Sequence, residues 1–430
     1  MSAQQFIDKL ARYKERIFAQ DSETAYSYEY FLNSVEDLRA IIRDKNLQRK
    51  VVLYPVVHSP LTLIDLVALA LEKAIVVPMD SEKSCDPRIM GLADEDLSGK
   101  GKTNKFPQKE EGIEGLRAEG KAALVLSSSG STGEPKWVLH DMDALLGKYL
   151  KLQHRRTVPL VYQMDNVSGI EVAISIASAG GTLLAPDERS PQELSGSLQS
   201  LGAKPDLLSM TPSYLKLLLL NHVPEVYSNV QHINLGGERL LKQDLELFKK
   251  AFPMARIHSF YGTTETSSIK TSTKEGSNWI KWGQEGVDFK VIDGELLLAK
   301  GPNQMRKQLF APLSTDEWYA TGDWVVPREE GYYEVVGRKD AVFNVGGKKV
   351  DPMAVEQALL SFGQVQACKV LAEPNALLGN MVVAKLVAKK EKELEANLRK
   401  WCAQQLPEHA QPMKYYFVQS FEINKRLKAI

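Results

Sequence analysis

Residues 121–136 of the chain read KAALVLSSSGSTGEPK, an apolar run followed by serine, threonine and glycine and closed by Pro-Lys. The apolar run at 121–126 predicts a buried β-strand. Serine and glycine clusters usually mark an ordinary loop, but this segment also has the parts of a phosphate-binding loop. Gly130 and Gly133 let the backbone approach a ligand closely, and successive N–H groups can form an anion-binding nest.

The side chains of the same segment add hydroxyl groups and one positive charge. Lys136 can serve as a point charge for a phosphate group. The spacing is not that of a Walker loop, because no Gly-Lys-Ser/Thr follows Gly130 at the required distance. The residues predicted to bind phosphate are Ser128, Ser129, Gly130, Ser131, Thr132, Gly133 and Lys136.

Composition and charge indicate an ordinary globular protein without a polyanionic partner. The 430 residues include 54 Lys and Arg and 54 Asp and Glu. Because a binder of nucleic acid is usually strongly basic, we expect no nucleic-acid partner, and any phosphate binding must be local. The three cysteines, Cys85, Cys368 and Cys402, show no metal-ligand spacing and fit a reduced, cytoplasmic protein.

Residues 1–20 do not have the pattern of a signal peptide, and no uninterrupted apolar segment is long enough to span a membrane. Residues 1–20 carry apolar side chains at helical spacing among charged ones, which predicts an amphipathic helix packed on the body rather than a signal peptide. The best apolar candidate, near residues 66–77, is interrupted by Glu72 and Lys73. We therefore expect no membrane-spanning helix.

Strand-like and helix-like segments alternate through most of the chain. Residues 51–78 read as strand, helix, strand, which predicts a βαβ unit in a parallel sheet. Residues 81–120, rich in Lys, Gly and Glu, are expected to form an exposed connection. The alternation then resumes up to residue 265. The sequence therefore predicts a large, layered α/β domain with parallel sheets, whose ligands bind at strand ends.

The pattern changes after about residue 280. Two apolar runs flank Asp293-Gly294 and predict a β-hairpin, and further strands are expected up to residue 347. The remainder reads as a small α+β unit with a polar tail. From the length, we predict an N-terminal domain at 1–339 and a small C-terminal domain at 340–430, although no Pro/Gly-rich linker marks the boundary.

Four more motifs follow the serine/glycine loop in order: YGTTE at 261–265, YATGDW at 319–324, GRKD at 337–340 and FEINKRLK at 421–428. Together with the loop, this series resembles the adenylate-forming (ANL) superfamily of acyl-CoA synthetases, peptide-synthetase adenylation domains and luciferases. Any one of these motifs alone would be weak evidence for the family. The resemblance covers most of the chain and is thinnest in residues 1–120.

The resemblance implies a nucleotide site that takes ATP. Tyr261 should stack on the adenine, and the Gly-Gly-Glu that follows a predicted strand should line the adenine pocket. Asp323 should accept hydrogen bonds from the ribose hydroxyls, and Arg338 should help to hold the ribose and phosphate. The other residues assigned to this site are Gly236, Gly237, Glu238, Gly262 and Thr263.

Three residues are implied as catalytic. Thr264 should hydrogen-bond the α-phosphate, and Glu265 should hold Mg²⁺, for which carboxylate oxygen is a suitable ligand. Lys425 should reach the α-phosphate and the carboxylate of the acid together. A cation between two approaching anions stabilises the charge that develops there.

The acid substrate is expected near residues 165–169. Asn166-Val167-Ser168-Gly169 resembles the His-x-x-Gly of acyl and aryl acid ligases. Family members that activate amino acids carry an Asp for the ammonium group, and Asp165 is close to that place but one or two positions early. With Asp165, Asn166 and Gly169 as the predicted lining, we favour a small carboxylic acid without an α-amino group.

The second substrate implied by the resemblance is a thiol, either coenzyme A or the phosphopantetheine of an acyl carrier protein. Gly346 and Gly347 should shape a loop beside the thiol channel. The small domain of the family is mobile, and it turns near the Asp of Gly-Arg-x-Asp. Asp340 is therefore the predicted hinge.

The chain departs from the family pattern at three positions. Trp137 stands where Gly usually follows Pro-Lys, Asn424 where Gly usually precedes the C-terminal Lys, and Lys428 where Arg is common. We predict an ATP-dependent, AMP-forming acid–thiol ligase. Two alternatives stay open: an enzyme that activates an amino acid for carrier-protein loading, and a degenerate, non-catalytic member that acts as a partner protein.

Overall fold

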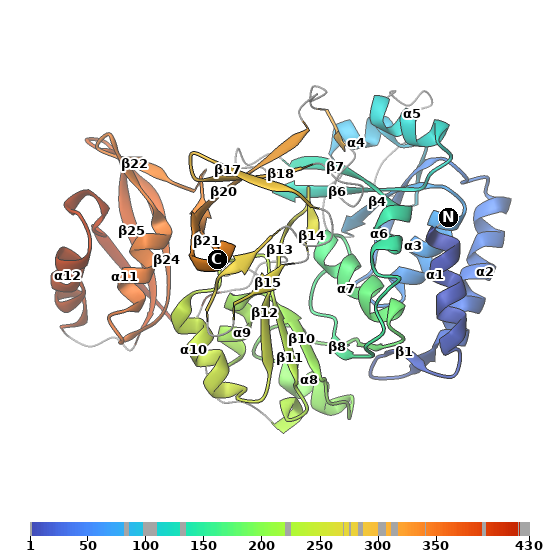
Figure 1. Cartoon of the computed structure of the whole chain (residues 1–430), viewed down its shortest axis with the longest axis horizontal. Helices are drawn as coiled ribbons and strands as arrows, with labels where there is room; N and C mark the ends of the chain where they lie inside the picture. Colours follow the sequence, from blue (N-terminus) through green and yellow to red (C-terminus); the bar gives the residue numbers. More distant parts are fainter. Residues whose placement is uncertain are drawn as a thin grey trace. The chain divides into compact units, whose positions relative to one another are not determined.

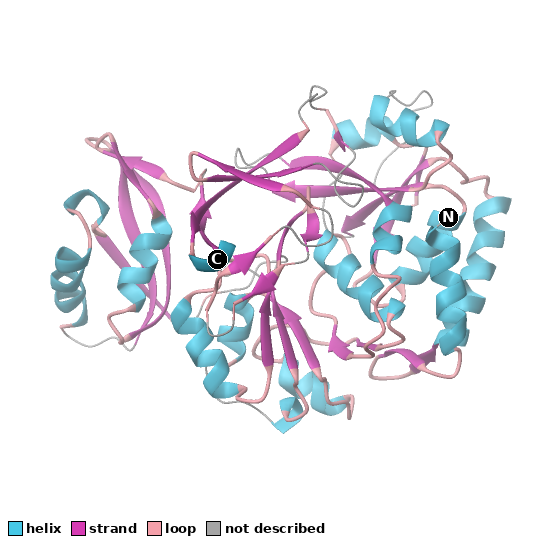
Figure 2. Ribbon diagram, viewed as in Figure 1, coloured by secondary structure: helices cyan, strands magenta, loops and turns pink. Residues whose placement is uncertain are grey.

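The structure is a computed structural model, which describes residues 2–80, 86–97, 110–129, 135–219, 225–269, 271–274, 277–282, 287–299, 307–310, 317–339, 341–388, 393–419 and 421. The chain divides into two compact units. The first comprises Met1–Asn278, Trp282–Val287 and Ala299–Glu317, and the second Trp279–Lys281, Asp288–Leu298 and Trp318–Ile430. The predicted α/β class is confirmed (Figure 2). The boundary predicted between residues 339 and 340 stays a prediction.

A six-stranded, mostly parallel sheet is the centre of the first unit, and it contains the predicted βαβ unit. The neighbouring strands β3, β4 and β6 run parallel, whereas β7 returns antiparallel to β6. In spatial order the strands are β19 (Lys307–Gln308), β7 (Pro135–Asp141), β6 (Ala123–Ser129), β4 (Ile75–Asp80), β3 (Val51–Val56) and β5 (Glu95–Asp96).

Helices cover both faces of this sheet because its strands are apolar on both faces. Val52, Val76 and Leu124 pack into a large core with five helices, and the alternate residues pack into a second core with two (Figure 1). The first group is α1 (Ser2–Leu10), α2 (Tyr28–Asp44), α3 (Thr62–Leu71), α6 (Met142–Lys148) and α7 (Val167–Ser178); the second is α4 (Pro87–Leu92) and α5 (Glu111–Ala118).

Two expectations about this unit are wrong. The helix predicted over residues 1–20 ends at Leu10, and Ile17–Gln20 is strand β1, because pairing with β2 and β9 buries Phe18 there. The connection predicted to be exposed at 81–120 contains α4 and α5, whose apolar side chains cover the sheet. In both places tertiary packing outweighs the local sequence pattern.

Two smaller sheets and a hairpin complete the first unit. One sheet is β2-β1-β9-β8, and the other is the parallel sheet β10-β11-β12, whose strands are followed by turns at their carboxyl ends. The elements are β2 (Ala25–Ser27), β8 (Thr157–Pro159), β9 (Thr182–Leu184), β10 (Leu207–Met210), β11 (His232–Leu235), β12 (Arg256–Ser259), β13 (Tyr261–Thr263), β14 (Ser267–Ile269), β15 (Ser272–Thr273), α8 (Leu194–Ser200), α9 (Pro212–Leu218) and α10 (Lys242–Ala251).

The second unit begins with antiparallel strands. The hairpin predicted at Asp293-Gly294 is confirmed: both residues have positive φ, +49° and +79°, as a two-residue hairpin turn requires. The strands are β16 (Ile280–Lys281), β17 (Phe289–Ile292), β18 (Glu295–Ala299), β20 (Trp318–Pro327) and β21 (Tyr333–Arg338).

The remaining part of the second unit is the predicted small α+β structure. Two helices pack on one face of the sheet β24-β25-β26 around Val355, Leu398 and Leu386. The elements are β22 (Phe343–Val345), β23 (Lys348–Val350), α11 (Pro352–Leu360), β24 (Val365–Asn375), β25 (Gly379–Ala388), α12 (Leu394–Gln405) and β26 (Lys414–Val418). Cys368 is half-buried, and Cys402 is buried. Throughout the described ranges, every helix is too short or too polar to cross the bilayer.

Candidate active site

The serine/glycine loop and the YGTTE motif meet at the end of β6. The hydroxyl of Ser128 is buried and donates to Oε1 of Glu265 at 2.9 Å, across 137 positions of sequence. In the β6–β7 ladder Ser128 lies opposite Lys136, whose side chain is exposed. The two motifs predicted to bind phosphate and metal therefore converge on one place in the fold.

Six of the predicted site residues lie outside the described residues, so they stay predictions. They are Gly130, Ser131, Thr132, Gly133, Asp340 and Lys425. For Ser129 the structure describes the strand but not the side chain.

The Trp137 side chain packs in a hydrophobic core rather than beside Lys136. It is 6% exposed and joins the core between the central sheet and α4 and α5. Its indole N–H donates to Oδ2 of Asp86 at 2.9 Å. Hydrogen bonds from Arg88 and Trp137 lower the pKa of Asp86 to about 2. Adjacent residues of a strand point to opposite faces, so this indole and the ammonium group of Lys136 lie on opposite sides of the sheet.

Thr263, Thr264 and Glu265 belong to the tight β13–β14 hairpin. A Cβ atom at Gly262 would lie 2.6 Å from the Ser267 carbonyl oxygen, so only glycine fits there. The Thr263 amide donates to the Thr266 hydroxyl at 2.9 Å. The motif is therefore a closed turn that presents Thr264 and Glu265 at its tip.

The groups predicted to bind adenine lie at the ends of neighbouring strands. Tyr261 is mostly buried and meets Trp282 edge to face, with ring centroids 5.5 Å apart. After β11, Gly237 adopts φ of +80°, which favours glycine. Oε2 of Glu238 accepts from the Ser213 amide at 3.1 Å, which ties this turn to the start of α9. Their contact with adenine stays a prediction.

In the second unit, the structure brings together the two residues predicted to hold the ribose. Asp323 and Arg338 are directly opposite in the β20–β21 ladder, and Nη1 of Arg338 lies 3.4 Å from Oδ1 of Asp323. The same nitrogen donates to the Thr321 carbonyl at 3.1 Å. Two separate motifs, Thr-Gly-Asp and Gly-Arg-x-Asp, therefore form one ion-paired unit.

The residues predicted to line the acid pocket have local structural roles. The side chain of Asn166 caps α7 by accepting from the Gly169 amide at 3.1 Å. A Cβ atom at Gly169 would lie 2.0 Å from the Gln163 carbonyl oxygen, so this position requires glycine. Asp165 is half-buried in the turn before the helix. That these residues also contact a substrate stays a prediction.

The capping bond of Asn166 leads to a prediction about stability. Replacing Asn166 by Ala removes the acceptor for an N-terminal amide of α7 and should lower the free energy of unfolding by about 1 kcal/mol. Replacing it by Asp keeps a capping oxygen and should cost much less. Urea denaturation of the two variants checks this. An equal loss of stability in both variants would mean that the side-chain NH₂ of Asn166, rather than its capping oxygen, stabilises the fold.

The predicted thiol-channel glycines form the turn between β22 and β23. Gly346 and Gly347 have φ of +56° and +79°, and the Gly346 amide donates to the Leu378 carbonyl at 2.9 Å. The positive φ values explain why glycine occupies both positions. The role of the turn near a thiol stays a prediction.

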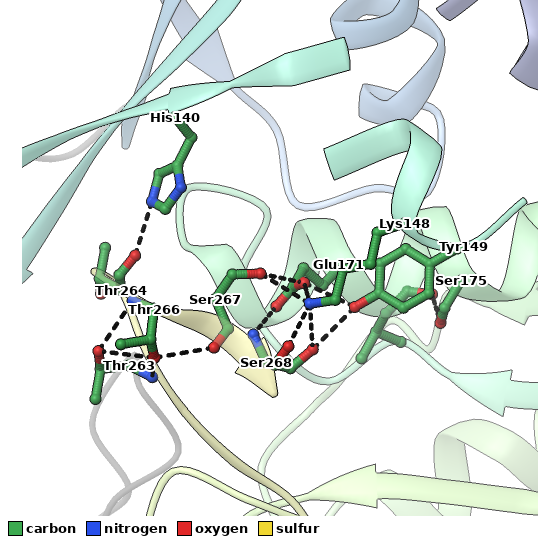
Figure 3. Close-up of polar contacts among 11 residues, drawn as sticks. His140, Lys148, Tyr149, Glu171, Ser175, Thr263, Thr264, Thr266, Ser267 and Ser268 are labelled. Carbon is green, nitrogen blue, oxygen red and sulfur yellow. Dashed lines mark hydrogen bonds and ion pairs between the residues drawn. The ribbon is translucent and has the colours of Figure 1, made fainter. Parts of the chain in front are cut away.

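Sequence reasoning missed a group of polar side chains behind the β13–β14 hairpin (Figure 3). His140 contacts the Thr264 carbonyl, and Glu171 and Lys148 contact Ser267 and Ser268. One signal was available: Glu171 is the only charged residue in the run GIEVAISIASA, which is otherwise apolar or small. A charge in a buried helix is rarely without a partner.

Among the described residues, the protein offers Mg²⁺ one suitable carboxylate ligand here, and the remaining ligands would have to come from the substrate. In the described part of the chain, no three His, Cys, Asp or Glu side chains gather closely enough to hold a metal ion. Mg²⁺ in phosphate-transfer sites is commonly held by one or two carboxylates together with substrate phosphates. The carboxylate of Glu265, placed beside the phosphate-binding loop, fits that arrangement.

Two protein-family models match the chain. The AMP-binding enzyme family matches residues 82–301, and the AMP-binding enzyme C-terminal domain matches residues 354–428. The chain belongs to the AMP-binding enzyme family. As an AMP-binding enzyme it is a member of the ANL superfamily, as its motifs predicted.

Curated relatives of this AMP-binding enzyme include CoA ligases. It is 26% identical over 327 residues to 2-succinylbenzoate–CoA ligase of Enterococcus faecalis, covering 70% of this chain and 66% of that protein. It is also 26% identical over 330 residues to 4-coumarate–CoA ligase-like 4 of Oryza sativa subsp. japonica, covering 69% and 59%. The match thus spans less than two thirds of the length of these relatives.

Solved structures share the fold over nearly the whole chain. The anthranilate CoA ligase AuaEII, crystallised with anthranoyl-AMP, aligns with a TM-score of 0.78 and 16% sequence identity. The alignment covers 99% of this chain and 95% of AuaEII. The architecture of this AMP-binding enzyme is therefore that of an adenylate-forming enzyme.

Proposed function

We propose that this AMP-binding enzyme activates a carboxylic acid with ATP and then passes the acyl group to a thiol. The contact that carries the proposal is the hydrogen bond from Ser128 to Glu265, which joins the phosphate loop to the metal-binding motif. Asp323 and Arg338, which form an ion pair in the second unit, would bind the ribose. The alternative of a degenerate member has less support, because these paired groups are retained.

In the first step an oxygen of the acid's carboxylate attacks the α-phosphorus of ATP, and the bond to pyrophosphate breaks. Mg²⁺, when bound, neutralises phosphate charge. Glu265 would hold the metal, Thr264 would donate to an α-phosphate oxygen, and Lys425 would stabilise the charge that develops between the two anions. In the second step the thiol sulfur attacks the acyl carbon and AMP leaves.

The substrates are proposed from the relatives and from the chain's own residues. The names of the curated relatives are those of ligases that join aromatic acids to coenzyme A, so an aromatic or other small carboxylic acid and coenzyme A come first. A carrier-protein phosphopantetheine is the alternative thiol. The three widely spaced cysteines of the chain fit work in a reducing compartment such as the cytoplasm.

Pyrophosphate exchange with a panel of aliphatic, aromatic and amino acids tests the proposal. We expect exchange that depends on an acid without an amino group. Exchange with amino acids alone would favour carrier-protein loading. The absence of exchange with every acid, together with a rise of the melting temperature in ATP, would favour a non-catalytic nucleotide-binding protein.

The hinge makes a separate prediction. Proline at position 340 would fix φ there and restrict the preceding residue as well. Replacing Asp340 by Pro should therefore preserve pyrophosphate exchange and lower thioester formation about tenfold or more, if domain rotation is needed for the second step. Measuring both half-reactions on the purified variant checks it. Unaltered thioester formation would reject Asp340 as the hinge.

A further inference from the structure

A buried carboxylate lies directly behind the β13–β14 hairpin. Glu171 is 5% exposed, and three hydroxyl or ammonium groups converge on its Oε1 (Figure 3). Lys148 Nζ lies at 2.6 Å, the Ser267 hydroxyl at 2.6 Å and the Tyr149 hydroxyl at 2.7 Å. Its Oε2 accepts from the Ser268 amide at 2.7 Å. Glu171 thus bonds both the side chain of Ser267 and the next backbone amide.

Ser267 has an unfavourable backbone conformation. It is wholly buried and has φ of +58°, a region that residues with a side chain seldom adopt. Such a conformation persists only where the surroundings fix it. Glu171 provides two of those contacts, and Lys148 provides further bonds to the Ser267 hydroxyl and the Ser268 carbonyl.

The other end of the turn is held by His140 on β7. Its Nε2 lies 2.7 Å from the Thr264 carbonyl oxygen, so this nitrogen carries the proton. Burial lowers the pKa of His140, which keeps the ring neutral. The segment from Thr264 to Ser268 is thus fixed at both ends, and Glu265 lies between the two attachments.

The charge state of the anchor follows from its surroundings. Burial opposes ionisation of Glu171, but the Lys148 ammonium and the hydrogen bonds from Ser267 and Tyr149 outweigh it and lower the pKa of this carboxyl. A buried ion pair is by itself weak evidence for stability, because both charges lose their hydration. This pair contacts the strained Ser267, two positions after the YGTTE motif, and that location indicates a role in positioning the motif.

We propose that Glu171, neutralised by Lys148, is a positioning residue that holds the turn at Ser267 and so fixes where Thr264 and Glu265 meet the phosphates. This inference rests on the proposed function. It predicts a defect confined to the adenylate-forming step, because thiol attack on an acyl-adenylate that is already formed needs neither the metal nor pyrophosphate departure.

Replacing Glu171 by Gln tests the inference, since the side chain keeps its shape and loses its charge. We expect acyl-adenylate formation to fall by about tenfold to 100-fold, the effect of a small misplacement of reacting groups. Thioester formation from supplied acyl-adenylate should change less than about twofold.

Glu72→Gln is the matched control. Glu72 is also buried, and it accepts from Arg39 at 2.8 Å and from Arg43 at 2.6 Å. Glu72→Gln should lower the melting temperature about as much as Glu171→Gln does. It should leave both half-reactions intact. Equal losses in both half-reactions of the Glu171 variant would mean a merely structural role and would overturn the inference.

A rescue experiment separates positioning from general damage. Glycine adopts positive φ without a steric penalty, so Ser267→Gly should recover much of the lost rate in the Glu171→Gln background. The single Ser267→Gly variant should lose less than about threefold, because the carboxylate still accepts from the Ser268 amide. A double variant no faster than Glu171→Gln would contradict the role assigned to the turn.

Hydrogen–deuterium exchange decides the point without any substrate. The Ser268 amide should exchange faster in Glu171→Gln than in the wild type, and at the wild-type rate in Glu72→Gln. Unchanged exchange at Ser268 would overturn the anchor even if the enzyme is active. If the wild type forms no acyl-adenylate from any acid, the proposed function fails, while faster exchange would still support the anchor. If Glu171→Gln does not fold, Tyr149→Phe removes one bond and should give the same pattern more weakly.

Discussion

Replacing Glu265 by Gln should lower acyl-adenylate formation by about 1,000-fold, because a metal held at the phosphates stabilises the transition state by several kcal/mol. The amide has the same shape as the carboxylate and keeps an oxygen that can accept from the Ser128 hydroxyl. It lacks the charge that Mg²⁺ prefers. The fold should therefore survive while ATP-dependent turnover collapses. Pyrophosphate exchange measured across a magnesium titration checks this.

The control for this variant is Ser128→Ala. It removes one hydrogen bond to Glu265 and leaves the negative charge in place, so its effect should be much smaller, roughly tenfold. The Gln variant should also stay far below the wild type at high magnesium. Normal activity of Glu265→Gln at every magnesium concentration would show that the metal is held elsewhere.

Replacing Lys425 by Ala should separate the two half-reactions. Acyl-adenylate formation should fall by about 100-fold to 1,000-fold, the usual effect of removing one group that stabilises transition-state charge. Conversion of supplied acyl-adenylate to thioester should be largely intact, because no negatively charged acid approaches a phosphate in that step. Single-turnover measurement of each half-reaction checks the expectation.

A surface lysine of the same unit provides the control for Lys425. Lys414 on β26 pairs with Glu373 at 3.2 Å, and the Lys414 side chain is exposed, so Lys414→Ala should alter neither half-reaction. If Lys425→Ala slows both steps equally, its assignment to adenylate formation is wrong.

Local patterns in the sequence predicted the parts of the fold that depend on neighbouring residues. Asp293 and Gly294 form the expected turn because positive φ is needed at both positions of the hairpin. The apolar runs at 51–56 and 75–80 are parallel strands, as their alternation with a helix indicated. Asp323 and Arg338 were each assigned to the ribose from their motifs, but their direct pairing in the β20–β21 ladder was not predicted.

Features that arise from contacts distant in sequence were not predicted. The strand at Ile17–Gln20 exists because it pairs with β9, which nothing in the local spacing reveals. Likewise, Lys148, Glu171 and Ser267 come from three separate segments. Their shared purpose is visible only once the fold brings them together.

The position of the Trp137 indole has a consequence for the evolution of this protein. Its N–H is satisfied by Asp86, 51 positions earlier in the chain. A relative with glycine after Pro-Lys has no indole N–H at this position. Its residue at position 86 therefore does not have to accept a hydrogen bond from an indole. Asp86 also caps α4 by accepting from the Arg88 amide. Relatives with Trp after Pro-Lys should therefore keep a carboxylate that can serve both donors, whereas relatives with glycine should accept any capping residue there. A phylogeny of sequences with Trp at this position would show whether the pair arose in one lineage.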